Sequence, residues 1–181
     1  HDFRFRFHCF CVFLFWLYPT KDRGVFLAKL AMITFKPSTI SHKSDKAGRP
    51  DGLFDELRRK YVALTPEEWV RQHFVHYLVA HKHYPPGLVA NEISLTLNGT
   101  AKRCDTVVYD RQARPRVIVE YKAPHIEITQ KVFAQVSRYN MVLRVDYLIV
   151  SNGLQHYCCR MDYDTNSCKF LPDIPEYGEI L

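Results

Sequence analysis

The feature that most constrains the fold is a series of three short apolar segments between residues 92 and 121, separated by turn signals. Apolar and polar residues alternate in EISLTL (92–97), and the dipeptide that follows, Asn98-Gly99, strongly favours a hairpin turn. CDTVVYD (104–110) and RVIVEY (116–121) are rich in β-branched and aromatic residues, and the turn-forming RQARP separates them. We therefore expect three consecutive strands joined by hairpins.

A helix is predicted before these strands. In LTPEEW, Thr65 suits the N-cap, Pro66 suits the first helical position, and Glu68 is placed to close a capping box. Apolar residues then recur at helical spacing, so the helix is expected to cover about residues 66–82.

A second helix and further strands are predicted after the third strand. The helix is expected at about residues 126–143, where four apolar residues form a stripe at helical spacing: Val132, Val136, Tyr139 and Leu143. YLIV (147–150) is expected to form a buried strand, and Asn152-Gly153 to turn the chain into a returning strand at 155–161. This order of elements predicts an α/β fold with a mixed sheet (α+β) and a C-terminal hairpin.

The chain divides into three parts. Residues 64–181 are predicted to form the folded domain, and residues 32–63 a linker and lead-in, in which the polar stretch 36–52 is a flexible linker or loop. Residues 1–31 are rich in aromatic side chains and do not match the rest, so they are expected to be a non-native or disordered extension, with Met32 as the natural start. The apolar run within them is ten residues long, and a bilayer-spanning helix needs ~20, so no membrane contact is expected.

Composition narrows the function classes. Lys and Arg number 25 against 19 Asp and Glu, a net charge of +6 that mildly favours a polyanionic partner. Residues 1–31 hold five basic and two acidic side chains, so the remainder carries +3. Neither the ATP-binding P-loop pattern nor H-E-x-x-H occurs, and six cysteines without a C-x-x-C pair fit a protein of the reducing cytoplasm.

The third predicted strand ends in two opposite charges. In VIVEYKAP (117–124), side chains alternate across the strand, so Glu120 and Lys122 share one face. A hairpin between the second and third strands would bring Asp105 to the same end of the sheet. Two carboxylates and several water molecules suit Mg²⁺, and beside such an ion Lys122 can orient water or neutralise charge on a phosphate.

Simpler interpretations of these residues stay open at this point. An exposed ion pair worth less than ~1 kcal/mol also explains Glu120 and Lys122. A strand-end carboxylate also explains Asp105, and Asp110, on the opposite face of the same strand, is a rival acid.

Taken together, these residues resemble the PD-(D/E)XK nuclease superfamily. Asp105, Glu120-x-Lys122 and Gln135-V-S-R-Tyr139 follow the superfamily order and include the Q-x-x-x-Y motif of its RecB-like members. Four segments, RCDTVVYD, VEYKAP, QVSRYN and LIVSNG, are similar to the N-terminal nuclease domain of type I restriction enzyme R subunits. The resemblance covers roughly the part of the chain from 64 to 161, and it implies a restriction-endonuclease-like αβββαβ core.

The resemblance also implies a role for each residue. Asp105 and Glu120 would be the ligands of Mg²⁺, or of Mn²⁺ as the alternative ion, and Lys122 the catalytic lysine. Gln135 would hydrogen-bond near the metal-bound water or the scissile phosphate, and Tyr139 would hold its helix against the site. The implied activity is endonucleolytic hydrolysis of DNA, with restriction-system or motor subunits as partners.

The chain departs from the family pattern in places. Cys104 stands where the superfamily has its proline, and the helicase motor of a full R subunit is not in the sequence. A further acid from the first helix or first strand is common in the superfamily. Glu92 is the better candidate for it, because capping already explains Glu68. The alternative function is a non-catalytic DNA-binding or complex-forming module of a restriction system.

The expected extension gives a first testable prediction. A protein that begins at Met32 should be soluble and unfold cooperatively in a thermal or urea melt, because residues 1–31 would contribute nothing to the core. Loss of the cooperative transition on this truncation would show that the aromatic segment belongs to the core.

Overall fold

A computed structural model describes residues 42–44 and 50–181 of the chain. The expected extension, residues 1–31, lies outside the described residues. The helices and strands are β1 (His42–Ser44), β2 (Pro50–Asp55), β3 (Lys60–Ala63), α3 (Pro66–His81), η1 (Pro86–Leu88), β4 (Val89–Leu97), β5 (Thr100–Tyr109), β6 (Pro115–Tyr121), α4 (Gln130–Leu143), β7 (Tyr147–Ser151), β8 (His156–Asp162), β9 (Ser167–Leu171) and η2 (Tyr177–Ile180).

The strands found in the described residues form two sheets. The larger has six strands in the order β4-β5-β6-β7-β8-β9, and the smaller has three in the order β1-β2-β3. All neighbouring strands are antiparallel except β6 and β7, which are parallel. Parallel neighbours need a crossover connection, and α4 supplies it. The predicted order of one helix, three strands, a second helix, a strand and a hairpin is confirmed, and β9 extends the sheet by one strand more.

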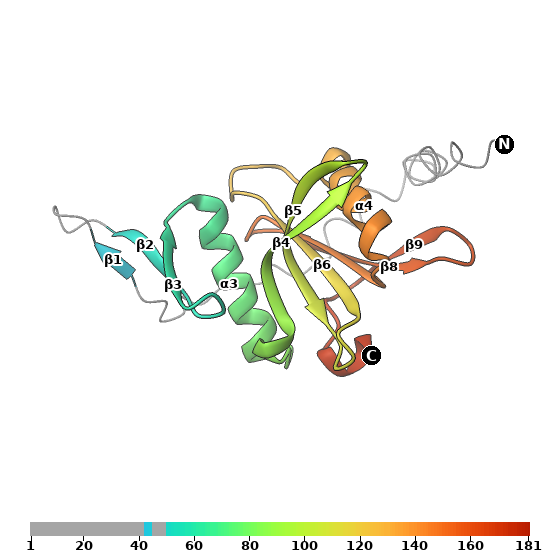
Figure 1. Cartoon of the computed structure of the whole chain (residues 1–181), viewed down its shortest axis with the longest axis horizontal. Coiled ribbons are helices and arrows are strands. Elements are labelled where there is room, and N and C mark those ends of the chain that lie inside the picture. Colours follow the sequence, from blue (N-terminus) through green and yellow to red (C-terminus); the bar gives the residue numbers. More distant parts are fainter. Residues whose placement is uncertain (1–41, 45–49) are drawn as a thin grey trace.

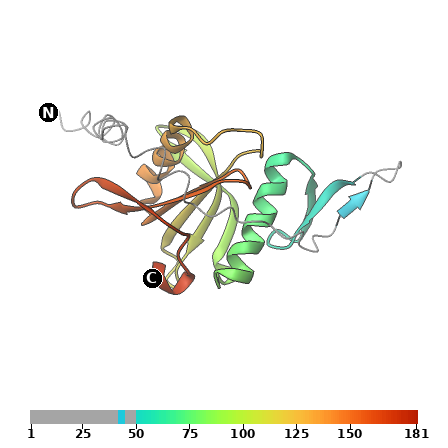
Figure 2. The same ribbon diagram turned by 180° about the vertical axis from the view of Figure 1, so that it is seen from behind.

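The two main helices cover opposite faces of the larger sheet. Alternate residues of β6 divide between them: Val117, Val119 and Tyr121 belong to the apolar cluster that contains α3, and Ile118 belongs to the one that contains α4. Figures 1 and 2 show that α3 lies between the larger and the smaller sheet. Strand β6 is therefore buried on both sides, which explains its nearly continuous apolar sequence.

The Asn98-Gly99 turn fixes the connection and the register between β4 and β5. Asn98 and Gly99 both have positive φ, 51° and 74°, the backbone that a two-residue type I′ turn requires. The turn sets Leu97 opposite Thr100 and, further along, Ile93 opposite Cys104. Strand β5 begins earlier than predicted because pairing starts directly at this turn, and β4 begins earlier because Val89, Ala90 and Asn91 also pair with β5.

Two predicted boundaries were wrong. The stretch 36–52, expected to be a loop, contains β1 and the start of β2. The residues of β1 are all polar, so they show no apolar alternation that would predict a strand. The second helix begins at Gln130 rather than near residue 126, since the preceding loop is held by a hydrogen bond of 2.9 Å from Asn152 Nδ2 to the Ile126 carbonyl.

The start of α3 agrees with the prediction except in one detail. Thr65 is the N-cap, and its hydroxyl accepts a hydrogen bond of 3.1 Å from the Glu68 amide. The predicted capping box is wrong, because the Glu68 carboxylate binds Arg58 and Arg71, each at 2.7 Å. A charge-assisted bond to arginine is stronger than one to a neutral amide, so the arginines take this side chain.

The cysteines in the described strands behave as small apolar residues. Cys104, Cys158 and Cys159 are buried with free thiols, whereas Cys168 is exposed. None of the helices among the described residues is long and apolar enough to cross a membrane.

The β4–β5 turn allows a controlled test of backbone strain. Gly99→Ala should lower the free energy of unfolding by about 1 kcal/mol, because an L residue is strained at a φ of 74° while the added methyl group meets nothing within 4 Å. Gly87→Ala is the matched control, since its methyl group also meets nothing within 4 Å and its φ is not positive. Equal losses in urea melts of both variants would contradict this account.

Candidate active site

The carboxyl end of β6 brings four of the predicted site residues together. Glu120 Oε1 accepts hydrogen bonds from Lys122 Nζ at 2.7 Å and from Gln135 Nε2 at 2.6 Å. The same Gln135 nitrogen donates to the Tyr139 hydroxyl at 3.1 Å. The Q-x-x-x-Y pair of α4 therefore packs over the E-x-K pair of β6, as one helical turn between Gln135 and Tyr139 allows.

Glu120 is a buried acid with one oxygen left over. The residue is 2% exposed, and Oε2 has no hydrogen-bond partner. Burial first, and then the nearby Asp105 carboxylate, raise the pKa of Glu120 from 4.5 to about 7, against the hydrogen bond from Lys122. A buried carboxylate oxygen without a partner is unfavourable, so this atom is suited to bind a cation, a proton or water.

Lys122 is held in place by a backbone hydrogen bond and by the acidic side chains around its ammonium group. Its amide donates to the Ser151 carbonyl at 2.9 Å, which extends the β6–β7 pairing by one residue. Burial works against the ammonium charge, but Glu120, Glu67 and Asp105 raise the pKa of Lys122 above its ordinary value. The lysine therefore carries its positive charge at neutral pH.

Asp105 is bonded on both of its oxygens. Oδ2 accepts from the Tyr121 amide at 2.9 Å, and Oδ1 accepts from Arg71 at 3.0 Å. The first bond ties Asp105 to the residue next to Glu120, and the Asp105 carboxylate is the second cause of the raised pKa of Glu120. The antiparallel pairing of β5 and β6 thus places Asp105 beside the group formed by Glu120, Lys122, Gln135 and Tyr139.

The rival acid Asp110 has a different role. Its side chain accepts from the backbone amides of Gln112 and Arg114, both at 2.9 Å, and from Arg114 Nε at 2.7 Å. Asp110 therefore organises the turn between β5 and β6, at the end of these strands away from Asp105 and Glu120.

The two candidate acids for an additional ligand are both engaged by arginines. Glu92 contacts Arg58 at 2.6 Å and Arg71 at 3.5 Å, and Glu68 contacts the same two arginines. Glu92 has a positive φ of 58°, which is uncommon outside glycine, and it lies opposite Asp105 between the paired residues of β4 and β5. Unusual backbone of this kind is concentrated at functional sites.

Glu67 is the acid that the sequence reasoning missed. It lies in the first turn of α3, half-buried, and burial followed by the charge of Asp105 raises its pKa, while Lys122 and Arg71 lower it. Its interactions with Asp105 and Lys122 place it at the edge of the site. The sequence contained one signal for this residue: Glu67 and Arg71 are four positions apart and therefore lie on the same side of the predicted helix.

Two further structural observations concern possible ligand sites in the described residues. Within residues 42–44 and 50–181, no three His, Cys, Asp or Glu side chains form a group that could hold a metal ion.

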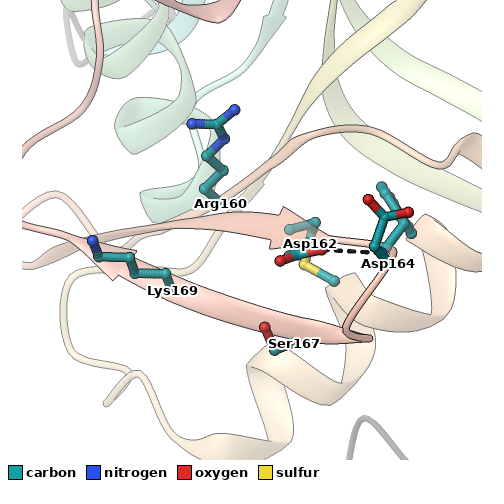
Figure 3. Close-up of a pocket in the computed structure, with 7 residues that line it drawn as sticks. Arg160, Asp162, Asp164, Ser167 and Lys169 are labelled. Carbon is teal, nitrogen blue, oxygen red and sulfur yellow. Dashed lines mark hydrogen bonds between the residues drawn. The ribbon is translucent and has the colours of Figure 1, made fainter.

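The structure also has a pocket of about 670 Å³ on the β8–β9 hairpin (Figure 3). It includes none of the predicted site residues and is lined by Arg160, Met161, Asp162, Tyr163, Asp164, Ser167 and Lys169.

Comparison with known families identifies the class of this chain. The family of the type I restriction enzyme R protein N terminus (HSDR_N) matches residues 66–175, more than half of the sequence. The chain therefore belongs to this family, and the resemblance seen in the sequence is confirmed. No curated protein matches the chain.

Two solved structures are similar to this one. The first is a fragment of a candidate HsdR subunit of a type I restriction enzyme from Vibrio vulnificus, with 20% identity and a TM-score of 0.49, covering 65% of this chain and 24% of that chain. The second is a candidate nuclease belonging to DUF820 from Anabaena variabilis, with 9% identity and a TM-score of 0.42, covering 76% of this chain and 86% of that chain. The chain thus spans 24% of the HsdR fragment's length.

The burial of Glu120 predicts that replacing it with a neutral residue changes the stability of the protein by an amount that depends on pH. The pKa of Glu120 is about 7 in the folded state and 4.5 ordinarily, so the folded protein binds this proton more tightly than the unfolded chain does. The stability that results is fully present below pH 4.5 and is lost as pH rises through 7. Such a shift corresponds to up to about 3 kcal/mol. Glu120→Gln should therefore raise the melting temperature relative to wild type more at pH 8 than at pH 5, in buffer containing EDTA.

The control for this measurement is an exposed acid. Glu127→Gln should change the melting temperature by the same amount at both pH values, since Glu127 lies exposed in the loop before α4 and its charge is surrounded by water. A Glu120→Gln effect that is the same at pH 5 and pH 8 would refute the proposed burial penalty.

Proposed function

We propose that this chain is a Mg²⁺-dependent nuclease domain that hydrolyses phosphodiester bonds in DNA within a restriction system. The observation that carries the proposal is the state of the Glu120 carboxylate. One oxygen is fixed by Lys122 and Gln135, and the other is buried without a partner beside Asp105. Membership of the restriction enzyme R protein family supports the same class of activity.

The donor set fits a hard divalent cation. Asp105 and Glu120 offer carboxylate oxygens from adjacent strands, and Mg²⁺ is commonly held by one or two carboxylates together with water molecules and substrate phosphates. The unpartnered Glu120 Oε2 is an available ligand atom. Mn²⁺ also accepts oxygen ligands and is the alternative ion. When bound, such an ion supplies an activated water and polarises the phosphate.

The remaining residues orient the site. The Gln135 amide fixes Glu120 Oε1 and leaves Oε2 free to take a ligand, and the Tyr139 hydroxyl fixes the amide in turn. Lys122 keeps an ammonium group 2.7 Å from Glu120 Oε1, where it can stabilise negative charge on a phosphate as the bond to the leaving oxygen breaks. Preorganised charges of this kind act more strongly in a partly buried site than in water.

Basic side chains next to Gln135 suit a DNA backbone. Lys131 and Arg138 are exposed and lie four residues before and three residues after Gln135 on α4. Helical spacing puts both near Gln135 on the surface of the helix. Contacts from lysine and arginine to phosphates are independent of sequence and weaken with salt, so DNA binding should be backbone-directed and salt-sensitive.

The test is DNA cleavage by isosteric variants. Asp105→Asn and Glu120→Gln should each abolish most Mg²⁺-dependent cleavage, because they remove the charge that holds the ion. Lys122→Ala should lower the cleavage rate by a factor of about 10² to 10³, as for other electrostatic stabilisers. Lys122→Arg should restore little, because a planar guanidinium does not replace a compact ammonium.

Matched controls come from the β8–β9 hairpin, which includes none of the site residues. Asp164→Asn and Lys169→Ala make the same changes of charge there and should cleave like wild type. Equal cleavage by all variants would reveal a contaminating nuclease or another site. Salt-sensitive DNA binding by a wild-type protein that cleaves neither DNA nor RNA with Mg²⁺ or Mn²⁺ would favour the non-catalytic module.

A further inference from the structure

Arg71 occupies a place in the site that the sequence did not predict. Its guanidinium donates to Asp105 Oδ1 at 3.0 Å and to Glu68 Oε2 at 2.7 Å, and it lies 3.5 Å from Glu92 Oε1. The residue is 6% exposed, and the guanidinium stands over the Tyr121 ring at 5.9 Å. Arg71 is therefore a buried cation in direct contact with a proposed metal ligand.

The acids around Arg71 outnumber the cations. Arg58, from the turn between β2 and β3, contacts Asp55, Glu68 and Glu92. Two arginines thus share four carboxylates, because Asp105 is the fourth. Arg103 approaches Glu92 at 3.5 Å, but its side chain is 66% exposed and screened by solvent.

The two arginines differ in one respect that matters for the site. In the described part of the chain, Arg71 is the only residue that forms an ion pair with Asp105. Arg58 balances the same network, through Glu68 and Glu92, but it does not contact Asp105. A divalent ion on Asp105 would therefore repel Arg71 at close range in a partly buried site, where charges interact more strongly than in water.

We propose that Arg71 is a positioning residue that holds Asp105 when no metal is bound and competes with the divalent ion for its charge. This inference rests on the proposed metal site. The Tyr121 amide keeps Asp105 in place through its other oxygen, so Asp105 stays bonded to the residue next to Glu120 when Arg71 is weakened. Arg71 thus limits the affinity of the site for the ion and keeps the site folded without it.

The experiment measures stability and ion affinity rather than cleavage. In EDTA, Arg71→Met should melt below wild type, because Asp105, Glu68 and Glu92 lose a shared cation. Mn²⁺ should raise the melting temperature of this variant by at least twice the shift seen for wild type, because the ion replaces the missing charge. A merely structural role would lower the melting temperature equally with and without Mn²⁺.

Arg58→Met is the matched control. It removes the same charge from the same network, yet its Mn²⁺-induced shift should equal that of wild type, because Arg58 does not touch Asp105. In Arg71→Met combined with Asp105→Asn, the enlarged shift should disappear. Equal shifts in wild type, Arg58→Met and Arg71→Met would overturn the proposal.

A second variant covers the case in which Arg71→Met does not fold. Arg71→Lys keeps the charge but replaces the two guanidinium nitrogens that bond Glu68 and Asp105 with a single ammonium nitrogen, so its hold on Asp105 should weaken. Isothermal titration should show Mn²⁺ binding about three- to tenfold tighter than in wild type, and equal or weaker binding would overturn the inference. Absence of Mn²⁺ binding to wild type would overturn the proposed metal site as well, whereas binding with equal affinity in both proteins overturns only the role of Arg71.

Discussion

The burial of β6 on both faces is the constraint on which the site depends. Successive side chains of β6 pack alternately in the apolar cluster that contains α3 and in the one that contains α4. By the same alternation Glu120, at the end of the apolar sequence, lies on the face covered by α4. The parallel pairing with β7 holds the strand in register as far as the Lys122 amide. A carboxylate and an ammonium are thereby fixed at the edge of a close-packed core, where neither can move far.

Electrostatics leaves this rigid arrangement with charge that is not fully balanced. Burial makes the charged form of Glu120 costly, and the Asp105 carboxylate beside it adds repulsion. The protein relieves part of this cost with Lys122 and Gln135 on one side and with Arg71 on the other. The relief is incomplete, because Glu120 Oε2 remains without a partner. A site of this kind gains stability from a bound cation, which is a physical reason to expect one there.

The sequence predicted the parts of the fold that depend on local pattern. Helical spacing and an N-cap located α3 almost to the residue, the Asn98-Gly99 dipeptide located the β4–β5 turn, and strand alternation placed Glu120 and Lys122 on one face. These signals work because they involve neighbours along the chain.

What the sequence could not predict depends on contacts between distant residues. Arg58 bonds Glu92, and Arg71 bonds Asp105, each across 34 positions, and no local period encodes such pairs. The same two arginines also bond Glu68 and take it out of its predicted capping role. The charge balance of the site is therefore a property of the folded chain, although the acids and bases that form it were visible in the sequence.

The most direct measurement of the central claim is X-ray diffraction from crystals soaked in Mn²⁺, recorded so that the anomalous signal locates the ion. If Asp105 and Glu120 share one metal ion, one strong peak should lie about 2.1 Å from Glu120 Oε2 and from an Asp105 oxygen. This is the distance expected for a hard divalent ion on carboxylates. Ordered Mn²⁺ elsewhere in the molecule, with none between Asp105 and Glu120 at saturating concentration, would contradict it.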